Sequence, residues 1–471
     1  MYRLARFAFI LAFPALLPAA VADNPDVQGA IRLFDAWMKG QMVFGGFPGV
    51  AVGVVHDQQL VWSKGYGYAN TAAKTPLTAQ TKFRMASHSK LFTATAIMQL
   101  REAGKLRLDD PITKYLPGIA ITPADPDDPA ITIEELLTHA SGLPREAGSH
   151  WVDYRFPDAA EVKQYLATHR APYSPEVRWK YSNLALTLAG MIVENVSGER
   201  YNAYIDRHIF APLGMKDSSF DQQVPGLATG YGRRMPNGSR ATMPYIDAKA
   251  MGPATGLTST VEDMARFVSL QLRTGRTGGA QILNTGSLRE MHRVRRLEND
   301  WTRGNAIGFA VNRMKDKLYV GHGGSYPGYK THTYIQLDSK VGVIVLTNGD
   351  DSGPAEIAMR LMDTVGDAVG KAGATPKKTI PWEASWSRFA GHYSSASGEL
   401  EVVELNQRLV MIDPQAETLS ATQRLEPLGN GLFRLEAPAG GAPVGETVRF
   451  IEQGGKVTRI YVGDSYRERV Q

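Results

Sequence analysis

The period of the hydrophobic positions changes several times along this chain, and each change predicts a new element. An amphipathic first helix is predicted by apolar residues that recur at helical spacing: Val27, Ile31, Phe34 and Met38. Residues 48–55 then form an apolar run typical of a buried strand, and residues 60–68 form a second strand. Because only a short polar connection separates these two strands, we expect them to form a hairpin.

The middle of the chain, about residues 105–300, has mainly helical patterning with long loops between the segments. Strand composition returns late, in four segments that are separated by turn residues: 306–311, 317–322, 330–337 and 341–347. An amphipathic helix over 354–369 follows them. Strands at both ends with helices between them predict an α+β domain, whose first and last strands meet in one antiparallel sheet.

A Gly-, Pro- and Lys-rich segment separates this domain from the rest of the chain. We place the main domain at 23–370, the linker at 371–384 and a small C-terminal domain at 385–471. The last domain has short alternating strands with Gly, Asn and Pro between them: 400–405, 408–412, 432–436 and 448–451. This spacing predicts an all-β barrel or sandwich of about ninety residues.

The first 22 residues have the features of an export signal. Arg3 and Arg6 precede an apolar stretch at 7–17, and an A-x-A cleavage site ends at Ala22. The apolar stretch is short and is interrupted by prolines, which disfavours the alternative of a retained membrane anchor. We therefore predict a signal peptide at 1–22 and a periplasmic or secreted mature protein without a membrane span.

The composition narrows the possible functions. The chain has 471 residues, of which 43% are hydrophobic, so it has ample core for an enzyme. Removal of two arginines with the signal lowers the formal net charge from +5 to +3, which is too mild to indicate nucleic-acid binding. A basic cluster at 292–296 is followed by acidic residues and is interpreted as a solvated surface. The chain has no cysteine, which excludes disulfides, thiolate ligands and a cysteine nucleophile.

Candidate chemistry begins with an S-x-x-K motif. Ser87 and Lys90 open an apolar helical segment, 91–100, and residues three apart on a helix lie on the same face one turn apart. An amine at Lys90 can therefore reach and activate the Ser87 hydroxyl. The motif alone is weak, because Ser87 as a helix cap and Lys90 as a solvated charge would give the same pattern.

Two later segments strengthen the motif. Tyr181-Ser182-Asn183 opens a second apolar segment, and His322-Gly323-Gly324-Ser325 ends a predicted strand, where glycines let a ligand lie against the backbone. In this order, the S-x-x-K, Y-x-N and H-G-G elements resemble those of the serine β-lactamase and penicillin-binding-protein superfamily. The resemblance covers most of 27–370 and is greatest for the class C-like branch, peptidase family S12, with its D-aminopeptidases, DD-peptidases and esterases. It also includes the segments 139–143 and 256–267.

This resemblance implies a β-lactamase/transpeptidase-like fold, in which an antiparallel sheet is flanked by helices and a helical subdomain. The C-terminal segment resembles the lipocalin-like barrels of some S12 peptidases, which can mediate assembly. The implied catalytic residues are Ser87 as nucleophile, Lys90 as its activator and Tyr181 as proton shuttle. The division of base duty between Lys90 and Tyr181 stays open.

The resemblance also implies the residues that hold the substrate. Asn183 would orient Lys90 and a substrate amide, and the H-G-G element would border the cleft. The backbone N–H groups of Ser87 and Ser325 would form the oxyanion hole. His322 departs from the pattern, because β-lactamases and many DD-peptidases have a lysine there. A histidine is mostly neutral at pH 7 and is a weaker anchor for a carboxylate, so we expect poor β-lactamase activity.

The sequence thus predicts an exported serine hydrolase that cleaves amide or ester bonds through an acyl-serine. Peptides with D-residues are the first expected substrates, and small esters are next. A β-lactamase or DD-carboxypeptidase, and a non-catalytic cell-wall-binding protein, remain as alternatives. An α/β-hydrolase is disfavoured because no G-x-S-x-G occurs, and a metallohydrolase because no H-E-x-x-H occurs. We expect no cofactor, no metal and no nucleic-acid partner.

Overall fold

The computed structural model describes residues 21–148, 150–220, 224–273, 280–298, 300–315, 317–374, 380–414, 422–436 and 444–470. Most of the predicted signal peptide, residues 1–20, lies outside this part. The chain divides into two compact units, Met1–Ala374 and Thr375–Gln471, and each is described by itself. Within the described residues, the structure has no helix with the length and hydropathy needed to cross a membrane.

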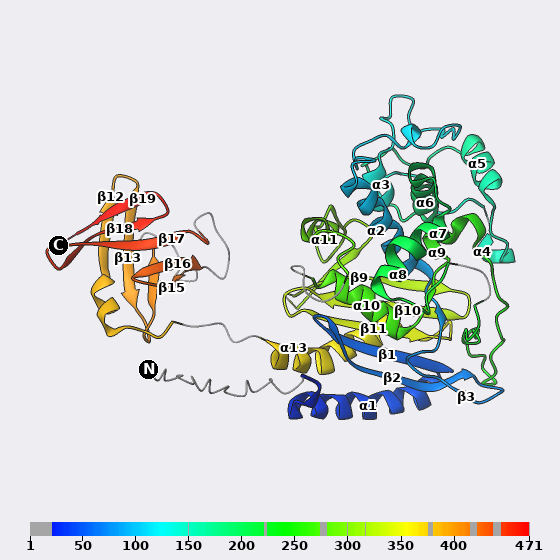
Figure 1. Cartoon of the computed structure of the whole chain (residues 1–471), viewed down its shortest axis with the longest axis horizontal. Helices are drawn as coiled ribbons and strands as arrows, with labels where there is room; N and C mark the ends of the chain where they lie inside the picture. Colours follow the sequence, from blue (N-terminus) through cyan, green and yellow to red (C-terminus); the bar gives the residue numbers. More distant parts are fainter. Residues whose placement is uncertain are drawn as a thin grey trace, which may run out of the picture. The chain divides into compact units, whose positions relative to one another are not determined.

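Among the described residues, the first unit contains an antiparallel sheet of nine strands, which differ in length (Figure 1). Its order is β3-β2-β1-β11-β10-β9-β8-β7-β6. The central strands are β1 (Gly49–His56), β2 (Gln59–Asn70), β9 (Lys317–Tyr326), β10 (Tyr329–Gln336) and β11 (Val341–Thr347). The edge strands are β3 (Thr75–Pro76), β6 (Arg296–Leu297), β7 (Arg303–Asn305) and β8 (Ala310–Met314). Since β1 pairs with β11, the predicted meeting of the two ends of the domain is confirmed.

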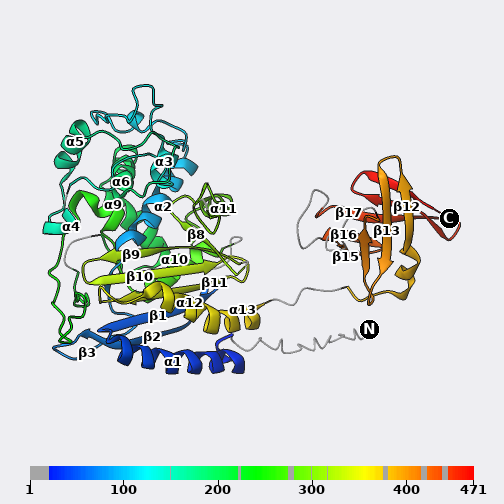
Figure 2. The ribbon, with the colours of Figure 1, turned by 180° about the vertical axis from the view of Figure 1, so that it is seen from behind.

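Two helical layers cover the sheet, one on each face (Figures 1 and 2). One layer comprises α1 (Pro25–Gly45), α12 (Pro354–Leu361), a π-helical turn (Met362–Gly366) and α13 (Asp367–Gly373). On β1, Val50, Val52 and Val54 pack in the core with these helices, whereas Ala51 and Val55 pack in the core on the other side. Alternate side chains of a strand point to opposite faces, so burial on both faces explains the unbroken apolar run.

The other layer is the predicted helical subdomain. Its longer helices are α2 (Ser89–Glu102), α5 (Ala159–Thr168), α6 (Asn183–Ser197), α10 (Val261–Gln271) and α11 (Thr285–His292). Its short helices are α3 (Ile133–Leu137), α4 (His150–Asp153), α7 (Tyr201–Ile205), α8 (Ala211–Leu213) and α9 (Gly252–Thr255). At the start of α3, Thr132 and Glu135 form a reciprocal capping box, which satisfies two backbone N–H groups. Helix α2 is buried along most of its length, so the packing around it holds its side chains in place, including that of Lys90.

Some predictions in the first unit are wrong. The strand expected at 306–311 is β8, at Ala310–Met314, and the pattern did not reveal β6 and β7 because they have only two and three residues. The basic cluster at 292–296 is not a solvated face: His292 is buried and Arg295 pairs with both Glu290 and Glu134. Helix α13 continues to Gly373, inside the segment predicted as linker.

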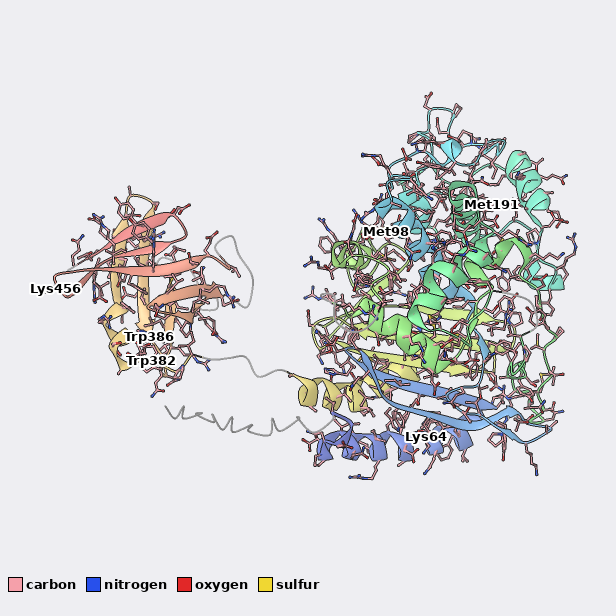
Figure 3. The ribbon with its side chains drawn as sticks, in the orientation of Figure 1. Lys64, Met98, Met191, Trp382, Trp386 and Lys456 are labelled. Atoms are coloured by element: carbon pink, nitrogen blue, oxygen red, sulfur yellow. The ribbon has the colours of Figure 1, made fainter. Side chains whose placement is uncertain are left out.

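Among its described residues, the second unit forms a closed barrel of eight strands, which confirms the predicted all-β class. Its strands are β12 (Gly391–Ser395), β13 (Gly398–Glu404), β14 (Leu409–Ile412), β15 (Gln423–Gly429), β16 (Leu432–Glu436), β17 (Thr447–Gln453), β18 (Lys456–Val462) and β19 (Ser465–Arg469). β12 pairs with β19 and closes the barrel, so none of the described strands has an open edge. A 3₁₀ segment, Ala384–Phe389, brings Trp386 against Phe433 with ring centres 5.1 Å apart. Trp386 also lies beside Trp382 at one end of the barrel (Figure 3).

Candidate active site

The serine of the S-x-x-K motif lies in a tight turn between β4 (Phe83–Arg84) and α2. Ala86, just before Ser87, has a φ of 49°, a conformation that costs energy for a residue with a side chain. Ser89 holds this turn: its hydroxyl donates to the Ala86 carbonyl at 2.6 Å and accepts from the Leu257 N–H at 3.0 Å. The strained backbone is therefore fixed by contacts on both sides, and it presents Ser87 at the start of the helix.

Lys90 follows one turn later and is fully buried. Its Nζ lies 3.0 Å from Ser87 Oγ, and it donates to Asn183 Oδ1 at 2.7 Å and to the Ala254 carbonyl at 2.9 Å. Asn183 Nδ2 in turn donates to Glu146 Oε1 at 2.6 Å. A carboxylate only accepts hydrogen bonds, so this contact fixes the amide orientation and leaves Asn183 Oδ1 facing the lysine.

Tyr181 completes the set. Its hydroxyl lies 2.6 Å from Ser87 Oγ, and Lys90 Nζ lies 4.9 Å from the centre of its ring. The structure thus brings Ser87, Lys90, Tyr181 and Asn183 together, although they come from two segments more than 90 positions apart.

The segment 139–143, which is part of the family resemblance, supports the loop that carries Tyr181 and takes no direct part in the network. The His139 ring packs on the Tyr181 ring with centres 4.5 Å apart, and its Nδ1 accepts from the Ser182 N–H at 3.2 Å. The His139 carbonyl accepts from the Lys180 N–H at 2.8 Å. Gly142 has a φ of 70°, and a side chain there would overlap the Tyr173 carbonyl. These contacts hold the Tyr181 ring in the position in which its hydroxyl lies beside Ser87 Oγ.

Burial changes the pKa values of Lys90 and Tyr181, the two groups beside Ser87, in opposite directions. Burial lowers the pKa of Lys90 from 10.5 to about 7, with Arg145 adding to the effect and Glu146 opposing it. Burial also raises the pKa of the Tyr181 hydroxyl well above 10. Near neutral pH the phenol therefore keeps its proton, while Lys90 is partly neutral and can accept one.

The third element, on β9, runs beside the serine turn. A side chain at Gly324 would overlap the Met85 carbonyl and the Thr331 hydroxyl, so glycine is required where the two backbones meet. His88 joins the same elements: its ring nitrogens contact the hydroxyls of Thr333 at 2.9 Å and Thr331 at 3.1 Å. Ser325 follows Gly324 on β9 and is exposed.

His322 lies at the edge of the network. Burial, with the nearby Lys90 charge, lowers its pKa to about 3, so the ring is neutral across the physiological range. Its Nδ1 lies 2.6 Å from the Gly323 carbonyl, which only accepts, so Nδ1 carries the proton and Nε2 is an acceptor. His322 therefore supplies no cation at this position, as expected from its departure from lysine.

Two residues beside this network, Arg145 and Glu146, have no recognisable sequence signal. Besides holding Asn183, Glu146 pairs with Arg145, whose guanidinium carbon lies 5.3 Å from the centre of the Tyr181 ring. Both lie in a loop without periodic pattern, so no sequence signal singles them out. No cluster of metal-ligating side chains occurs in the part of the chain that the structure describes.

Comparison with known proteins agrees with this geometry. The sequence model of the Beta-lactamase family matches residues 34–366. The chain belongs to the β-lactamase family. The match includes all three motifs and ends before the barrel, so the fold and the hydrolase family expected from the motifs are confirmed for the first unit.

Individual relatives are distant. Beta-lactamase-like protein 2 of Dictyostelium discoideum is 28% identical over 343 residues, which cover 68% of this chain and 60% of that protein. Penicillin-binding protein 4* of Bacillus subtilis is 26% identical over 380 residues, covering 75% of this chain and 81% of that protein. The chain thus spans less than two thirds of the length of the Dictyostelium relative.

Solved structures extend the similarity to the barrel. The octameric penicillin-binding protein homologue from Pyrococcus abyssi has a TM-score of 0.64 at 25% identity and covers 93% of this chain and 99% of its own. A class C β-lactamase from Rhodobacter sphaeroides has a TM-score of 0.59 at 22% identity and covers 71% of this chain and 99% of its own. The second likeness shows the fold of the first unit alone.

Proposed function

We propose that this protein is an exported serine hydrolase of the S12 type, which cleaves amide or ester bonds through an acyl-enzyme on Ser87. The observation that carries the proposal is the placement of Ser87 Oγ within 3.0 Å of the Lys90 amine and 2.6 Å of the Tyr181 hydroxyl. A serine between a partly neutral amine and a protonated phenol has an acceptor for its proton and a donor for the leaving group.

The contacts of Lys90 favour the amine as the base. A neutral amine has two N–H bonds and one lone pair. The oxygens of Asn183 and Ala254 only accept, so they take the two N–H bonds and direct the lone pair toward Ser87. The Ser87 proton then moves to Lys90 as Oγ bonds to the substrate carbonyl carbon.

The remaining steps follow from the same groups. The tetrahedral oxyanion would be held by the backbone N–H groups of Ser87 and Ser325, the predicted oxyanion hole. Tyr181 donates its proton to the departing amine or alcohol and recovers one from Lys90, which leaves the acyl-serine. Water then attacks the ester carbon and passes one proton to Lys90 and Tyr181. The bond between the acyl carbon and Ser87 Oγ breaks, Oγ takes this proton, and the acid product leaves.

His322 guides the choice of substrate. Its neutral ring offers an acceptor at Nε2, which suits a substrate N–H or hydroxyl better than the carboxylate of a β-lactam. Peptides or amides with D-residues remain our first proposed substrates, and small esters come next. If the protein is instead a β-lactamase or a DD-carboxypeptidase, it is expected to turn over anionic substrates faster than their neutral analogues.

The test is intact mass and product release after incubation with D-amino acid amides, p-nitrophenyl esters, penicillin and a fluorophosphonate probe. We expect one fluorophosphonate adduct, lost in Ser87→Ala and kept in the matched variant Ser325→Ala, whose backbone N–H is unchanged. The absence of any adduct in the wild type would favour the non-catalytic binding protein. Rapid penicillin or nitrocefin turnover would overturn our interpretation of His322.

Export and assembly are further parts of the proposal. Cleavage after Ala22 is tested by N-terminal sequencing of protein recovered from the periplasm. Because the octameric Pyrococcus relative matches nearly the whole chain, we propose that copies of this protein associate, with the barrel as the expected contact. Light scattering of the full mature chain that gives the monomer mass at all concentrations would contradict this.

A further inference from the structure

The two oxygens that accept from Lys90 are held in different ways. Asn183 is fixed by its contact with Glu146. Ala254 belongs to α9, a helix of a single turn, and so short a helix leaves its last carbonyl groups without partners inside the helix. The position of the Ala254 carbonyl therefore depends on what the neighbouring elements bind on α9.

Thr93 binds the carbonyl group next to that of Ala254. It lies on α2 one turn after Lys90 and is fully buried. Its hydroxyl donates to the Pro253 carbonyl at 2.6 Å. Lys90 and Thr93 are three positions apart on one face of α2, so they bind two consecutive carbonyl groups of α9.

Tyr201 fixes the direction of the Thr93 hydroxyl. The two hydroxyl oxygens lie 2.7 Å apart. Since Thr93 has one proton to donate and the Pro253 carbonyl only accepts, Tyr201 is the donor in this contact. Burial raises the pKa of Tyr201, so the phenol keeps the proton that it donates. The other acceptor within reach of Thr93, the Ser89 carbonyl, is farther away at 3.3 Å.

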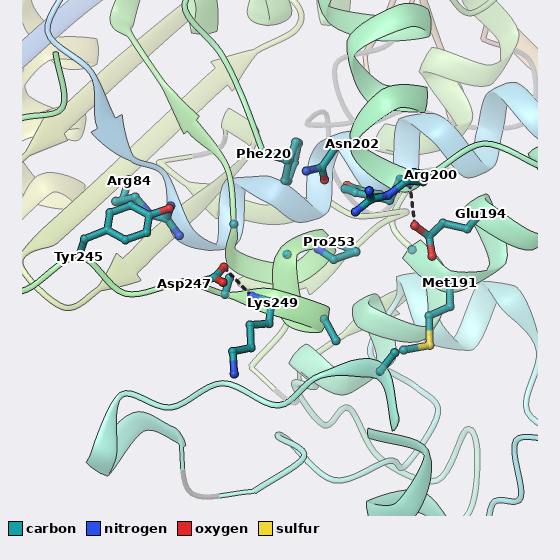
Figure 4. A pocket seen from close by; sticks show the side chains of 17 residues that line it. Arg84, Met191, Glu194, Arg200, Asn202, Phe220, Tyr245, Asp247, Lys249 and Pro253 are labelled. Atoms are coloured by element: carbon teal, nitrogen blue, oxygen red, sulfur yellow. Dashed lines mark hydrogen bonds between the residues drawn. The ribbon is translucent and has the colours of Figure 1, made fainter. Parts of the chain in front are cut away.

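The other side of α9 gives it less support. Pro253 borders a cavity of about 430 Å³, which Gly190 and Tyr201 also line (Figure 4). Side chains at a cavity have fewer atoms to pack against. The close contact on this side is with Gly190 of α6, where a side chain would overlap the Pro253 ring. Because α6 begins at Asn183, this contact also sets the spacing between the two acceptors of Lys90.

We propose that Thr93 is a positioning residue for Lys90. Its hydroxyl, oriented by Tyr201, holds the Pro253 carbonyl, and the next carbonyl along α9 then stays on the amine. Thr93 thereby helps to direct the lone pair of Lys90 toward Ser87. The effect on acylation rests on the proposed function, whereas the effect on the proton affinity of Lys90 does not.

The variant Thr93→Val removes the hydroxyl and keeps the shape of the side chain. If the Ala254 carbonyl leaves Lys90, the ammonium form loses a hydrogen bond, so we expect the pKa of Lys90 to fall by about one pH unit. The midpoint of fluorophosphonate labelling against pH is expected to fall with it. We also expect the plateau of labelling at Ser87 to drop by about three- to tenfold, because the lone pair is less well directed. Loss of packing alone would leave the midpoint in place.

Two further variants separate the hydroxyl from the packing. Thr93→Ser keeps the hydroxyl and is expected to keep the wild-type midpoint, even where it lowers stability. The matched control is Thr95→Val, at another fully buried threonine of α2, whose hydroxyl donates to the Leu91 carbonyl of the same helix at 2.7 Å. The charged and titratable groups that face Lys90 are the same in all of these proteins: His88, His139, Arg145, Glu146, Tyr181 and His322. A midpoint that is unchanged in Thr93→Val, or displaced equally in Thr93→Ser or Thr95→Val, would overturn the proposal.

Gly190→Ala tests the same step from the opposite side, in case Thr93→Val does not fold. The added methyl group would displace α9 from α6 and separate the two acceptors of Lys90. We expect the pKa of Lys90 to fall in this variant too. Folded Gly190→Ala protein with the wild-type midpoint would refute the assignment.

The pKa of Lys90 can also be measured without any labelling. Its Cε resonance, assigned through its loss in Lys90→Met, is followed from about pH 5 to 10. If wild-type Ser87 is not labelled while the midpoint of this resonance falls in Thr93→Val, the proposed function is wrong and the positioning role stands. If labelling succeeds and neither midpoint moves in Thr93→Val, the positioning role is wrong and the function stands.

Discussion

Lys90 gives the most quantitative prediction, because the titration of this one buried amine is expected to affect both the stability and the proposed activity. Burial lowers its pKa from 10.5 to about 7, a displacement that corresponds to roughly 5 kcal/mol. Below pH 7, native and unfolded chains both hold the proton, and the native state bears the full cost of the buried charge. Between about pH 7 and 10.5 only the unfolded chain holds it, so the native state gains stability as the pH rises.

Replacement of Lys90 by Met removes this titration. The unfolding free energy of the wild type minus that of Lys90→Met is expected to rise by roughly 4 kcal/mol from pH 7 to pH 10 and to stay constant below pH 6. Urea unfolding at each pH measures the difference, read from the transition that the substitution shifts. The matched control is Lys163→Met, which removes an exposed lysine on α5 and is expected to show no such rise.

The proposed role of Lys90 as the base also predicts how the rate of acylation depends on pH. If neutral Lys90 accepts the serine proton, fluorophosphonate labelling of Ser87 is expected to rise about tenfold per pH unit below pH 7 and to level off above about pH 8. Lys90→Met is expected to lose labelling by a factor of about 10² to 10⁴ on the plateau above pH 8, and to lose the rise between pH 5 and 7. A labelling rate that is flat from pH 5 to 9, or a stability difference that is constant up to pH 10, would refute the assignment of the base.

Three further substitutions test neighbouring contacts. Tyr181→Phe removes the 2.6 Å contact with Ser87, and we expect kcat/KM to fall by about 10²- to 10⁴-fold with an unchanged Tm. Glu146→Gln removes the carboxylate that raises the pKa of Lys90, so the midpoint of the labelling-against-pH curve is expected at lower pH; an upward displacement would contradict this. Gly324→Ala would force the β9 backbone away from the Met85 carbonyl, and we expect it to lower kcat more than it lowers stability. Gly118→Ala, at a surface turn with open space around it, serves as the comparison for kcat.

The candidate site could be predicted largely because its members carry local spacing. Ser87 and Lys90 lie one helical turn apart, and Tyr181 directly precedes a capped helix that begins at Asn183. The contact of Tyr181 and Asn183 with Ser87 and Lys90 is a tertiary contact that no local pattern contains. It could be predicted only from the order of the three motifs and the family resemblance that this order carries. Glu146 left no such trace, because a single carboxylate in a loop has the same sequence appearance whether it meets solvent or a buried amide.

The fold was predictable where burial is continuous and not where elements are short. β1 and β11 are buried on both faces, so their apolar runs stand out. β6 and β7 are held by neighbours more than by their own composition, and Arg296 lies in β6 although its charge predicts solvent. For strands this short, pairing decides the structure and the period of the side chains carries no information.

The network around Lys90 shows why the predicted base requires residues outside the motifs. A lysine buried without acceptors would be driven neutral by desolvation alone, but its lone pair would have no fixed direction. Two oxygen acceptors remove that freedom, and one of them, Asn183 Oδ1, faces Lys90 only because Glu146 holds the other end of the amide. Glu146 also keeps the pKa of Lys90 from falling further. One loop carboxylate therefore fixes the direction of the proposed base and opposes the fall in its pKa that burial causes, which makes it a positioning residue in the proposed mechanism.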